Sequence, residues 1–196
     1  MSNIIQILLE EHRNIDKLLL VLERELEVFD RSEEPDYEVL RAVIQYFQDY
    51  PENCHHPKED MVFEKLKMRD PAAAARVGDA EDDHKIETMR LHRLVEAVED
   101  ILAGREFLRK TFHDVVRDFI EHQRQHMDKE ERLLFPAAVQ GLGPDDWADI
   151  DARLCDRKDP LFNGTIETKF QALQGMILRW QQETETSRVQ TARAQI

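Results

Sequence analysis

The apolar residues of this chain recur at intervals of three and four along four stretches, residues 3–29, 36–68, 71–103 and 105–140. That spacing is the period of an α-helix with one buried face. In the first stretch the face consists of Ile5, Leu8, Ile15, Leu19, Leu22, Leu26 and Phe29. Because the stretches are long and their connections are short, the pattern predicts an all-α protein, an up-down four-helix bundle.

Prolines mark the expected ends of these helices. Pro35 ends the first helix, and Asp36 can cap the second. Pro71 suits the first position of the third helix. Pro51 and Pro57 fall inside the second helix, where each removes an amide donor, so we expect a kink or a local break there.

A helical extension is expected after the bundle, with residues 1–143 forming the bundle and residues 144–196 the extension. Residues 144–154 read as a short helix, and residues 165–182 as a fifth long helix with its own apolar stripe. The polar residues from Glu183 onward are expected to fray. Since the stripe must pack on the bundle or on a second copy, this helix is the expected contact for a homodimer or a protein partner.

Six polar side chains stand on the apolar faces, where leucine would be expected. They are His12, His55, Glu59, His84, His126 and Glu130. The second and fourth helices both carry the pattern H-x-x-x-E, which places an imidazole and a carboxylate one above the other on a helix. Burying a polar group without a partner costs roughly 2–7 kcal/mol, and a charged one more. A cation between these groups removes most of that cost, so the sequence predicts a metal site inside the bundle.

Four other residues lie close to this pattern. His122 precedes His126 by one turn on the same face, and either orients a ligand or bound molecule from outside the metal or is a buried histidine bonded to a carboxylate of a neighbouring helix. His56 and Asp60 lie about 100° round the helix from the predicted ligands, in an outer layer or at the surface. His92 lies off the inner face of the third helix and is expected at the surface.

Composition excludes several partners. A formal charge of −14 argues against nucleic acid, because phosphate contacts need a basic surface. No run of 18 apolar residues occurs, so we expect no transmembrane helix and no membrane partner, and the first residues do not resemble a signal peptide. Cys54 and Cys155 make no disulfide framework, and Cys54 is expected to be a small core residue. A cytoplasmic location follows as an expectation.

The chemistry of the six groups favours two metal ions. Four imidazoles and two carboxylates exceed the four ligands of a closed structural zinc site, and a carboxylate can bridge a metal pair. Imidazole with carboxylate favours iron, with manganese or zinc as alternatives. A bridging oxo or hydroxo group could offset the remaining positive charge. Six protein ligands leave open positions for a small molecule.

The spacing of these six residues, the phrase HHPKED-x-x-F and the phrase H-x-x-x-H-x-x-x-EE-x-LLFP resemble the hemerythrin-like, HHE cation-binding proteins over roughly residues 3–140. The resemblance implies a non-haem di-iron centre, with Glu59 and Glu130 as bridges and the four histidines as terminal ligands. Animal oxygen carriers of this family have a fifth histidine where this chain has Thr88, and an aspartate where it has Glu131. Those differences weigh against plain oxygen carriage.

The resemblance is closer to bacterial iron–sulfur repair proteins and to an iron-sensing domain of an F-box protein. The first hypothesis for function is a di-iron protein that binds or senses dioxygen or nitric oxide, or reports iron or redox state. The second is an enzyme that turns over peroxide or nitric oxide, with His122 as a proton donor. The third is delivery or storage of iron, including cluster repair, and the fourth a structural metal such as zinc. An open, histidine-rich site without an evident organic-substrate pocket favours the first.

Overall fold

The computed structural model describes residues 3–78, 80–105, 108–154, 159–162 and 167–179. Within these residues every regular element is helical, which confirms the all-α fold expected from the sequence. The chain divides into two compact units, residues 1–157 and 158–196, which are described separately.

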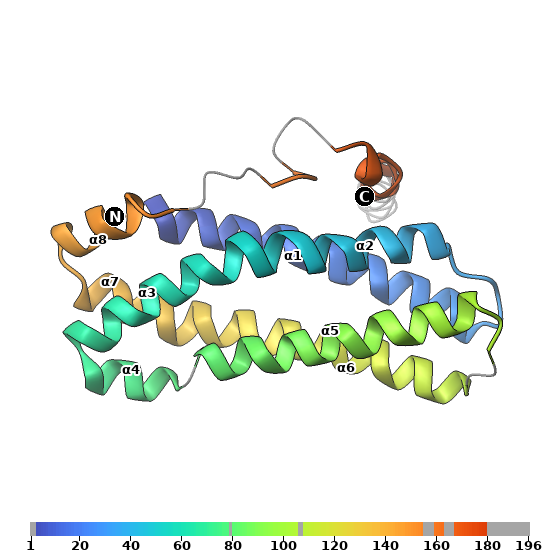
Figure 1. Cartoon of the computed structure of the whole chain (residues 1–196), viewed down its shortest axis with the longest axis horizontal. Helices are drawn as coiled ribbons and strands as arrows, with labels where there is room; N and C mark the ends of the chain where they lie inside the picture. Colours follow the sequence, from blue (N-terminus) through green and yellow to red (C-terminus); the bar gives the residue numbers. More distant parts are fainter. Residues whose placement is uncertain (1–2, 79, 106–107, 155–158, 163–166, 180–196) are drawn as a thin grey trace, which may run out of the picture. The chain divides into compact units, whose positions relative to one another are not determined.

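The described part of the first unit forms four helical rods that run alternately up and down (Figure 1). The first rod is α1 (Asn3–Asp30), and the second joins α2 (Tyr37–Tyr50), η1 (Pro51–His55) and α3 (His56–Arg69). The third consists of α4 (Pro71–Val77) and α5 (Ala80–Leu102). The fourth joins α6 (Arg109–Lys129), η2 (Glu130–Leu134) and α7 (Phe135–Gly141), and α8 (Pro144–Asp151) follows it. Both α1 and α5 pack against α2 and α6, so the rods enclose a common interior.

The start of the second rod is capped as the sequence predicts. The Asp36 carboxylate accepts hydrogen bonds from the backbone N–H groups of Glu38 and Val39, each at 3.1 Å. These two amides would otherwise lack partners at the first turn of α2.

The prediction of one continuous third helix over residues 71–103 was wrong, because the structure has two helices there. Gly78 has a φ of 92°, a backbone conformation that few residues other than glycine adopt, and it separates α4 from α5. Asp70 caps the short α4 by accepting from the Ala73 N–H at 2.9 Å. The fourth rod also begins later than expected, at Arg109.

The second rod contains a π-helical turn, η1, which begins at Pro51 and ends two residues before Pro57. The His56 N–H donates to the carbonyl of Pro51, five residues earlier, and Pro57 follows at once. This wider turn keeps the backbone bonded where an α-helix would be interrupted by the proline ring. The rod therefore continues through the kink position, and η1 ends at His55, a predicted metal ligand.

The fourth rod contains a second π-helical turn. The Phe135 N–H donates to the Glu130 carbonyl, directly before Pro136. The extra residue shifts the buried face by one position. Leu133, which the sequence pattern placed inside, is 44% exposed, whereas Leu134 is fully buried.

Apolar packing lies on both sides of the middle of the bundle. Towards α4 and α7 the core is a cluster of Ile4, Leu8, Val62, Phe63, Leu66, Ala73, Val77, Leu134, Phe135 and Ala138. Towards the other end aromatic pairs fill the interior, with ring centroids 4.6 Å apart for Phe29 and Phe112 and 5.1 Å apart for Phe47 and Phe119. None of the described helices combines the length and apolar character needed to cross a membrane.

In the second unit, η3 (Thr168–Phe170) leads into a helix over residues 171–179. Phe170 and Leu173 of the predicted stripe are buried. Ile166, Trp180, the tail from Glu183 and the last two residues of the turn predicted before this helix, Asn163 and Gly164, lie outside the described residues.

Candidate metal centre

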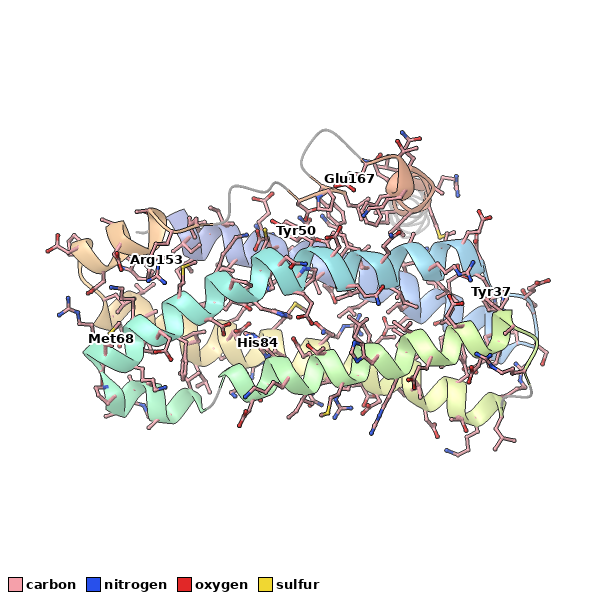
Figure 2. All side chains as sticks on the ribbon, viewed as in Figure 1. Tyr37, Tyr50, Met68, His84, Arg153 and Glu167 are labelled. Atoms are coloured by element: carbon pink, nitrogen blue, oxygen red, sulfur yellow. The ribbon has the colours of Figure 1, made fainter. Side chains whose placement is uncertain are left out.

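The six predicted ligands meet in the buried middle of the bundle, and all four rods contribute. Each is less than a tenth exposed: His12 2%, His55 1%, Glu59 0%, His84 8%, His126 5% and Glu130 2%. Figure 2 shows His84 on the α5 side of this interior. The polar groups that the periodicity placed on inner faces therefore lie together.

Glu59 stands at the centre of the group. Its Oε1 lies 3.0 Å from His12 Nε2 and 3.0 Å from His55 Nε2. Its Oε2 lies on the other side, 3.5 Å from His84 Nε2. The two oxygens of one carboxylate thus face different sets of imidazoles.

Glu130 also reaches both sides. Its Oε2 lies 3.4 Å from His12 Nε2 and 3.3 Å from His126 Nε2. Two groups of ligand atoms, each within 4.8 Å of one another, follow from these contacts: His12, His55 and Glu59, and Glu59, His84, His126 and Glu130. The two groups share the carboxylate of Glu59, and each has side chains that could hold a metal ion.

The donor set fits metal ions on its own chemistry. Glu59 Oε2, His84 Nε2, His126 Nε2 and both Glu130 oxygens are buried and have no hydrogen-bond partner among the described residues. Such orphaned groups are rare and costly. Two ligands of one ion bound at about 2.1 Å lie about 3.0 Å apart as neighbours and about 4.2 Å apart across the ion. The spacings of 3.3–3.5 Å fall in that range.

Several of the six groups bind protons more strongly than usual, whereas burial lowers the pKa of His126 to about 4. Burial alone would lower the pKa of His12, but contacts with Glu130 and Glu59 raise that pKa to about 11. Burial would likewise lower the pKa of His84. Contacts with Asp60 and Glu59 outweigh burial and raise that pKa to about 11. Burial first, and then the charge of Glu59, raises the pKa of Glu130 to about 8. Protons therefore occupy, at neutral pH, the positions for which cations would compete.

An outer layer of carboxylates holds the imidazoles in place. His12 Nδ1 lies 3.0 Å from Glu131 Oε1, and His84 Nδ1 lies 3.1 Å from Asp60 Oδ1. His55 Nδ1 lies 2.9 Å from Glu11 Oε2. Asp60 thus belongs to an outer layer, one of the two places expected for it.

Glu11 was not predicted from the sequence. Its carboxylate also accepts a hydrogen bond from the Tyr50 hydroxyl at 2.8 Å and forms an ion pair with the buried Lys58. Figure 2 labels Tyr50, on the second rod. A glutamate directly before His12 carries no periodic signal, since buried and exposed acids look alike in a sequence.

His56 and Glu87 form a further buried pair beside His84. His56 is only 8% exposed, so the surface position considered for it is wrong. Its ring stacks on His84, with centroids 4.2 Å apart and an interplanar angle of 13°, and its Nε2 lies 3.1 Å from Glu87 Oε2. Glu87 is 2% exposed and was missed. Its spacing of three residues after His84 on the same helix is the signal that could have found it.

The remaining predicted residues stand apart from the converging ligand atoms. His122 is half-buried, and its Nε2 has no hydrogen-bond partner among the described residues, so its orienting role stays a prediction. His92 is exposed, as expected. Cys54 is 1% exposed, as expected of a core residue, but it is disulfide-bonded, which the sequence analysis did not anticipate.

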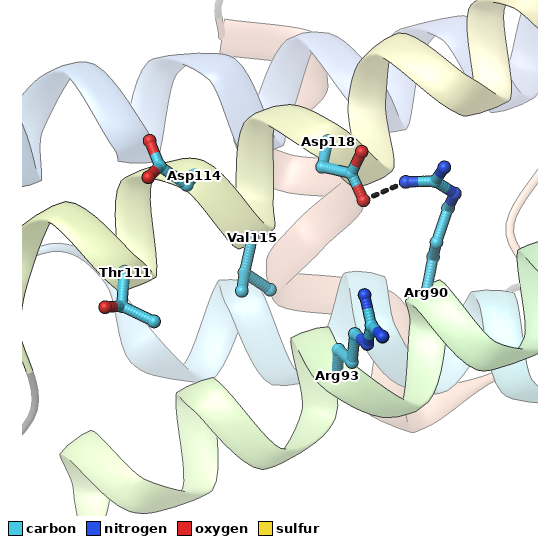
Figure 3. A pocket seen from close by; sticks show the side chains of 6 residues that line it. All are labelled: Arg90, Arg93, Thr111, Asp114, Val115 and Asp118. Atoms are coloured by element: carbon cyan, nitrogen blue, oxygen red, sulfur yellow. Dashed lines mark hydrogen bonds and ion pairs between the residues drawn. The ribbon is translucent and has the colours of Figure 1, made fainter.

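Two surface hollows differ in their relation to the centre. One encloses about 510 Å³, and His12 and Glu131 line it together with Arg13, Asp16, Lys17, Arg124, Met127 and Asp128. The other encloses about 490 Å³ between α5 and α6, where Arg90 pairs with Asp118 (Figure 3). None of the six predicted ligands lines the second hollow.

Metal-binding helical bundles build their sites from histidine and glutamate side chains on facing helices. The fold and the buried cluster place this chain in that class of protein. Comparison with known families makes this specific, because the model of the hemerythrin HHE cation-binding domain matches residues 3–138. The chain belongs to that family. No curated protein and no solved structure matches the chain.

Proposed function

We propose that the protein holds two iron ions between its four rods and uses this centre to bind or sense a small ligand, dioxygen or nitric oxide, or to report iron or redox state. The observation that carries the proposal is the position of the two glutamates. Glu59 and Glu130 each contact imidazoles on both sides of the centre, as carboxylates shared by two ions would.

The residues present suit this role. His12, His55, His84 and His126 would be terminal ligands, and Glu59 and Glu130 would be shared. When bound, iron with few protein ligands supplies open coordination positions for small molecules. Glu11, Asp60 and Glu131 hold the rings in orientation from outside.

Access to the centre favours a small ligand. The ring of His12 stacks on Phe135, with centroids 5.4 Å apart, and His12 also lines the 510 Å³ hollow. His12 itself is only 2% exposed, so the hollow gives narrow access to the centre. A diatomic molecule meets that restriction more easily than an organic substrate.

Absorption spectra of iron-loaded protein, recorded without oxygen, with oxygen, with nitric oxide and after degassing, test the proposal. We expect two irons per chain and a spectral change that reverses when the ligand is removed. Protein purified without added metal that is colourless and holds one zinc would instead indicate a structural metal. Iron lost to an apo acceptor would indicate delivery or storage, and sustained peroxide loss with retained iron would indicate an enzyme; each result would overturn the proposal.

A further inference from the structure

We propose that Glu87 is a third carboxylate ligand of the centre, on the side formed by His84 and His126. This inference rests on the proposed two-metal centre and adds to it a ligand from α5. It would give the two ions unlike surroundings.

The free oxygen of Glu87 points to the centre. Glu87 is 2% exposed, and neither of its carboxylate oxygens has a hydrogen-bond partner among the described residues. Its Oε1 is the oxygen that faces the centre. This oxygen lies 3.9 Å from His126 Nε2, an atom that also faces Glu130 at 3.3 Å. A separation of 3.9 Å is too long for a hydrogen bond. It lies within the range of about 3.0–4.2 Å for two ligands that share one ion.

The other oxygen of Glu87 lies within ion-pair distance of His56. Oε2 lies 3.1 Å from Nε2 of His56, whose ring stacks on His84. Ligand atoms of His56, His84 and Glu87 lie within 4.8 Å of one another. His56 is therefore placed to attract one carboxylate oxygen, while the second faces His126 at 3.9 Å.

The face of α5 explains why residue 87 supplies this ligand. Glu87 follows His84 by three residues, so both side chains project from one side of the helix. Thr88, one residue further, is engaged elsewhere: its hydroxyl lies 2.7 Å from Glu52 Oε1 and 3.1 Å from the His84 carbonyl. On this helix Glu87 is therefore the buried carboxylate, and the hydroxyl of Thr88 is bonded to Glu52.

The consequence is an asymmetric centre. The ion between His12 and His55 would share Glu59 and Glu130, whereas the ion between His84 and His126 would have Glu87 as well. Because a carboxylate is a hard, anionic ligand, the second position should bind a divalent cation more tightly than it would without Glu87.

The test is Glu87→Gln, which keeps the shape of the side chain and removes its charge, with Glu96→Gln on an exposed part of α5 as the matched control. Ferrous ion is titrated into the metal-free full-length chain, and metal content is measured after desalting. We expect Glu87→Gln to retain close to one ion instead of two, or to bind the weaker ion at least tenfold less tightly, while Glu96→Gln matches the parent. Two ions bound by Glu87→Gln with affinities within twofold of the parent would overturn the assignment.

A crystal structure of the wild-type protein loaded with manganese or zinc gives an answer that does not depend on the folding of a variant. A Glu87 oxygen at about 2.0–2.2 Å from an ion supports the inference. The inference is contradicted if both Glu87 oxygens lie beyond coordination distance of both ions. If the parent itself binds fewer than two ions, the proposed function fails. If the parent binds two and Glu87→Gln does not differ, only the role of Glu87 fails.

Discussion

Three of the imidazoles share one arrangement at the residue scale. In each, Nε2 faces Glu59 and Nδ1 faces a carboxylate outside the centre. The three pairs are His12 with Glu131, His55 with Glu11 and His84 with Asp60. A carboxylate at Nδ1 fixes the orientation and the tautomer of the ring and strengthens the other nitrogen as a metal ligand. The outer pairs therefore determine how well the inner atoms are placed.

The shared position of Glu130 leads to a first prediction. Replacing it by alanine in Glu130→Ala removes a carboxylate that contacts imidazoles on both sides, so metal content should fall from two ions per chain towards one or none. The same loss is expected for His126→Ala. Metal analysis of purified protein measures it.

His92→Ala is the control for this prediction, since His92 is an exposed histidine on α5. It should retain the metal content of the parent. Full occupancy of both ions in Glu130→Ala and His126→Ala would contradict the ligand assignment.

A second prediction concerns Glu11, the buried counter-charge of Lys58. Lys58 is only 3% exposed, so Glu11→Ala leaves a buried cation without its carboxylate. The free energy of unfolding should drop by about 3–5 kcal/mol. Urea unfolding of the metal-free protein measures it.

Two further variants separate this effect from a general loss of helix stability. Glu10→Ala, at the exposed neighbouring position, should change the free energy of unfolding by less than about 0.5 kcal/mol. Adding Lys58→Met to Glu11→Ala should restore part of the lost stability, because no unpaired charge remains buried. A double variant as unstable as Glu11→Ala alone would argue against the ion pair as the cause.

The sequence pattern predicts all six inner residues in the interior but not the buried acids around them. His12 and Glu130 stand out because they interrupt an apolar stripe. Glu11 and Glu87 lie beside a stripe, where acids are usually solvated, in a chain with 41 acidic residues. Only the packing of neighbouring rods decides that these two carboxylates are enclosed.

At the scale of the elements, both π-helical turns adjoin predicted ligands. η1 ends at His55, and η2 begins at Glu130. A π-turn inserts one extra residue into a helix and turns the following side chains round its axis. In the fourth rod, His126 and Glu130 thus face the centre up to the start of the turn, and Leu134 and Ala138 face the apolar cluster from its end. In the second rod, His55 ends the turn and Glu59 follows it by one helical turn.

The shifted face of the fourth rod gives a third prediction. Leu134→Ala should lower the free energy of unfolding by about 2–5 kcal/mol, because Leu134 is fully buried in the apolar cluster. Leu133→Ala should change it by less than about 0.5 kcal/mol, since Leu133 is 44% exposed. Thermal or urea unfolding of the two variants compares adjacent leucines. Equal losses, or a larger loss for Leu133→Ala, would mean that the rod continues as an unbroken α-helix.

The sequence could not reveal this shift. An α-helical period continued past Glu130 leads to Leu133 and Ala137, whereas Leu134 and Ala138 are the buried residues. The displacement is a single residue, and a run of adjacent leucines satisfies either register. The bounds of the first two rods, by contrast, were predictable, because long stripes and the capping Asp36 leave little freedom.

For the molecule as a whole, the centre joins the four rods of the first unit. Each rod supplies a polar group to the interior between two apolar regions, so cation binding and the packing of the rods are coupled. The metal-free bundle must satisfy the same groups with protons. That requirement explains why buried imidazoles such as His12 and His84 take pKa values of about 11 beside the carboxylates.

The last prediction follows from this competition between protons and metal ions. At pH 7 His12 and His84, with pKa values raised from 6.5 to about 11, and Glu130, with its pKa raised from 4.5 to about 8, carry protons that they must release to bind a metal. Metal uptake should therefore release at least one proton per ion, and affinity should rise as pH increases from 6 to 8, about tenfold per pH unit for each proton released. In the metal-free protein, the raised histidine pKa values contribute stability that is fully present below pH 6.5 and is lost as pH rises towards 11. Calorimetric titration in buffers of different ionisation enthalpy measures the protons, and binding heats that do not depend on the buffer would show that these groups are already deprotonated before the metal arrives.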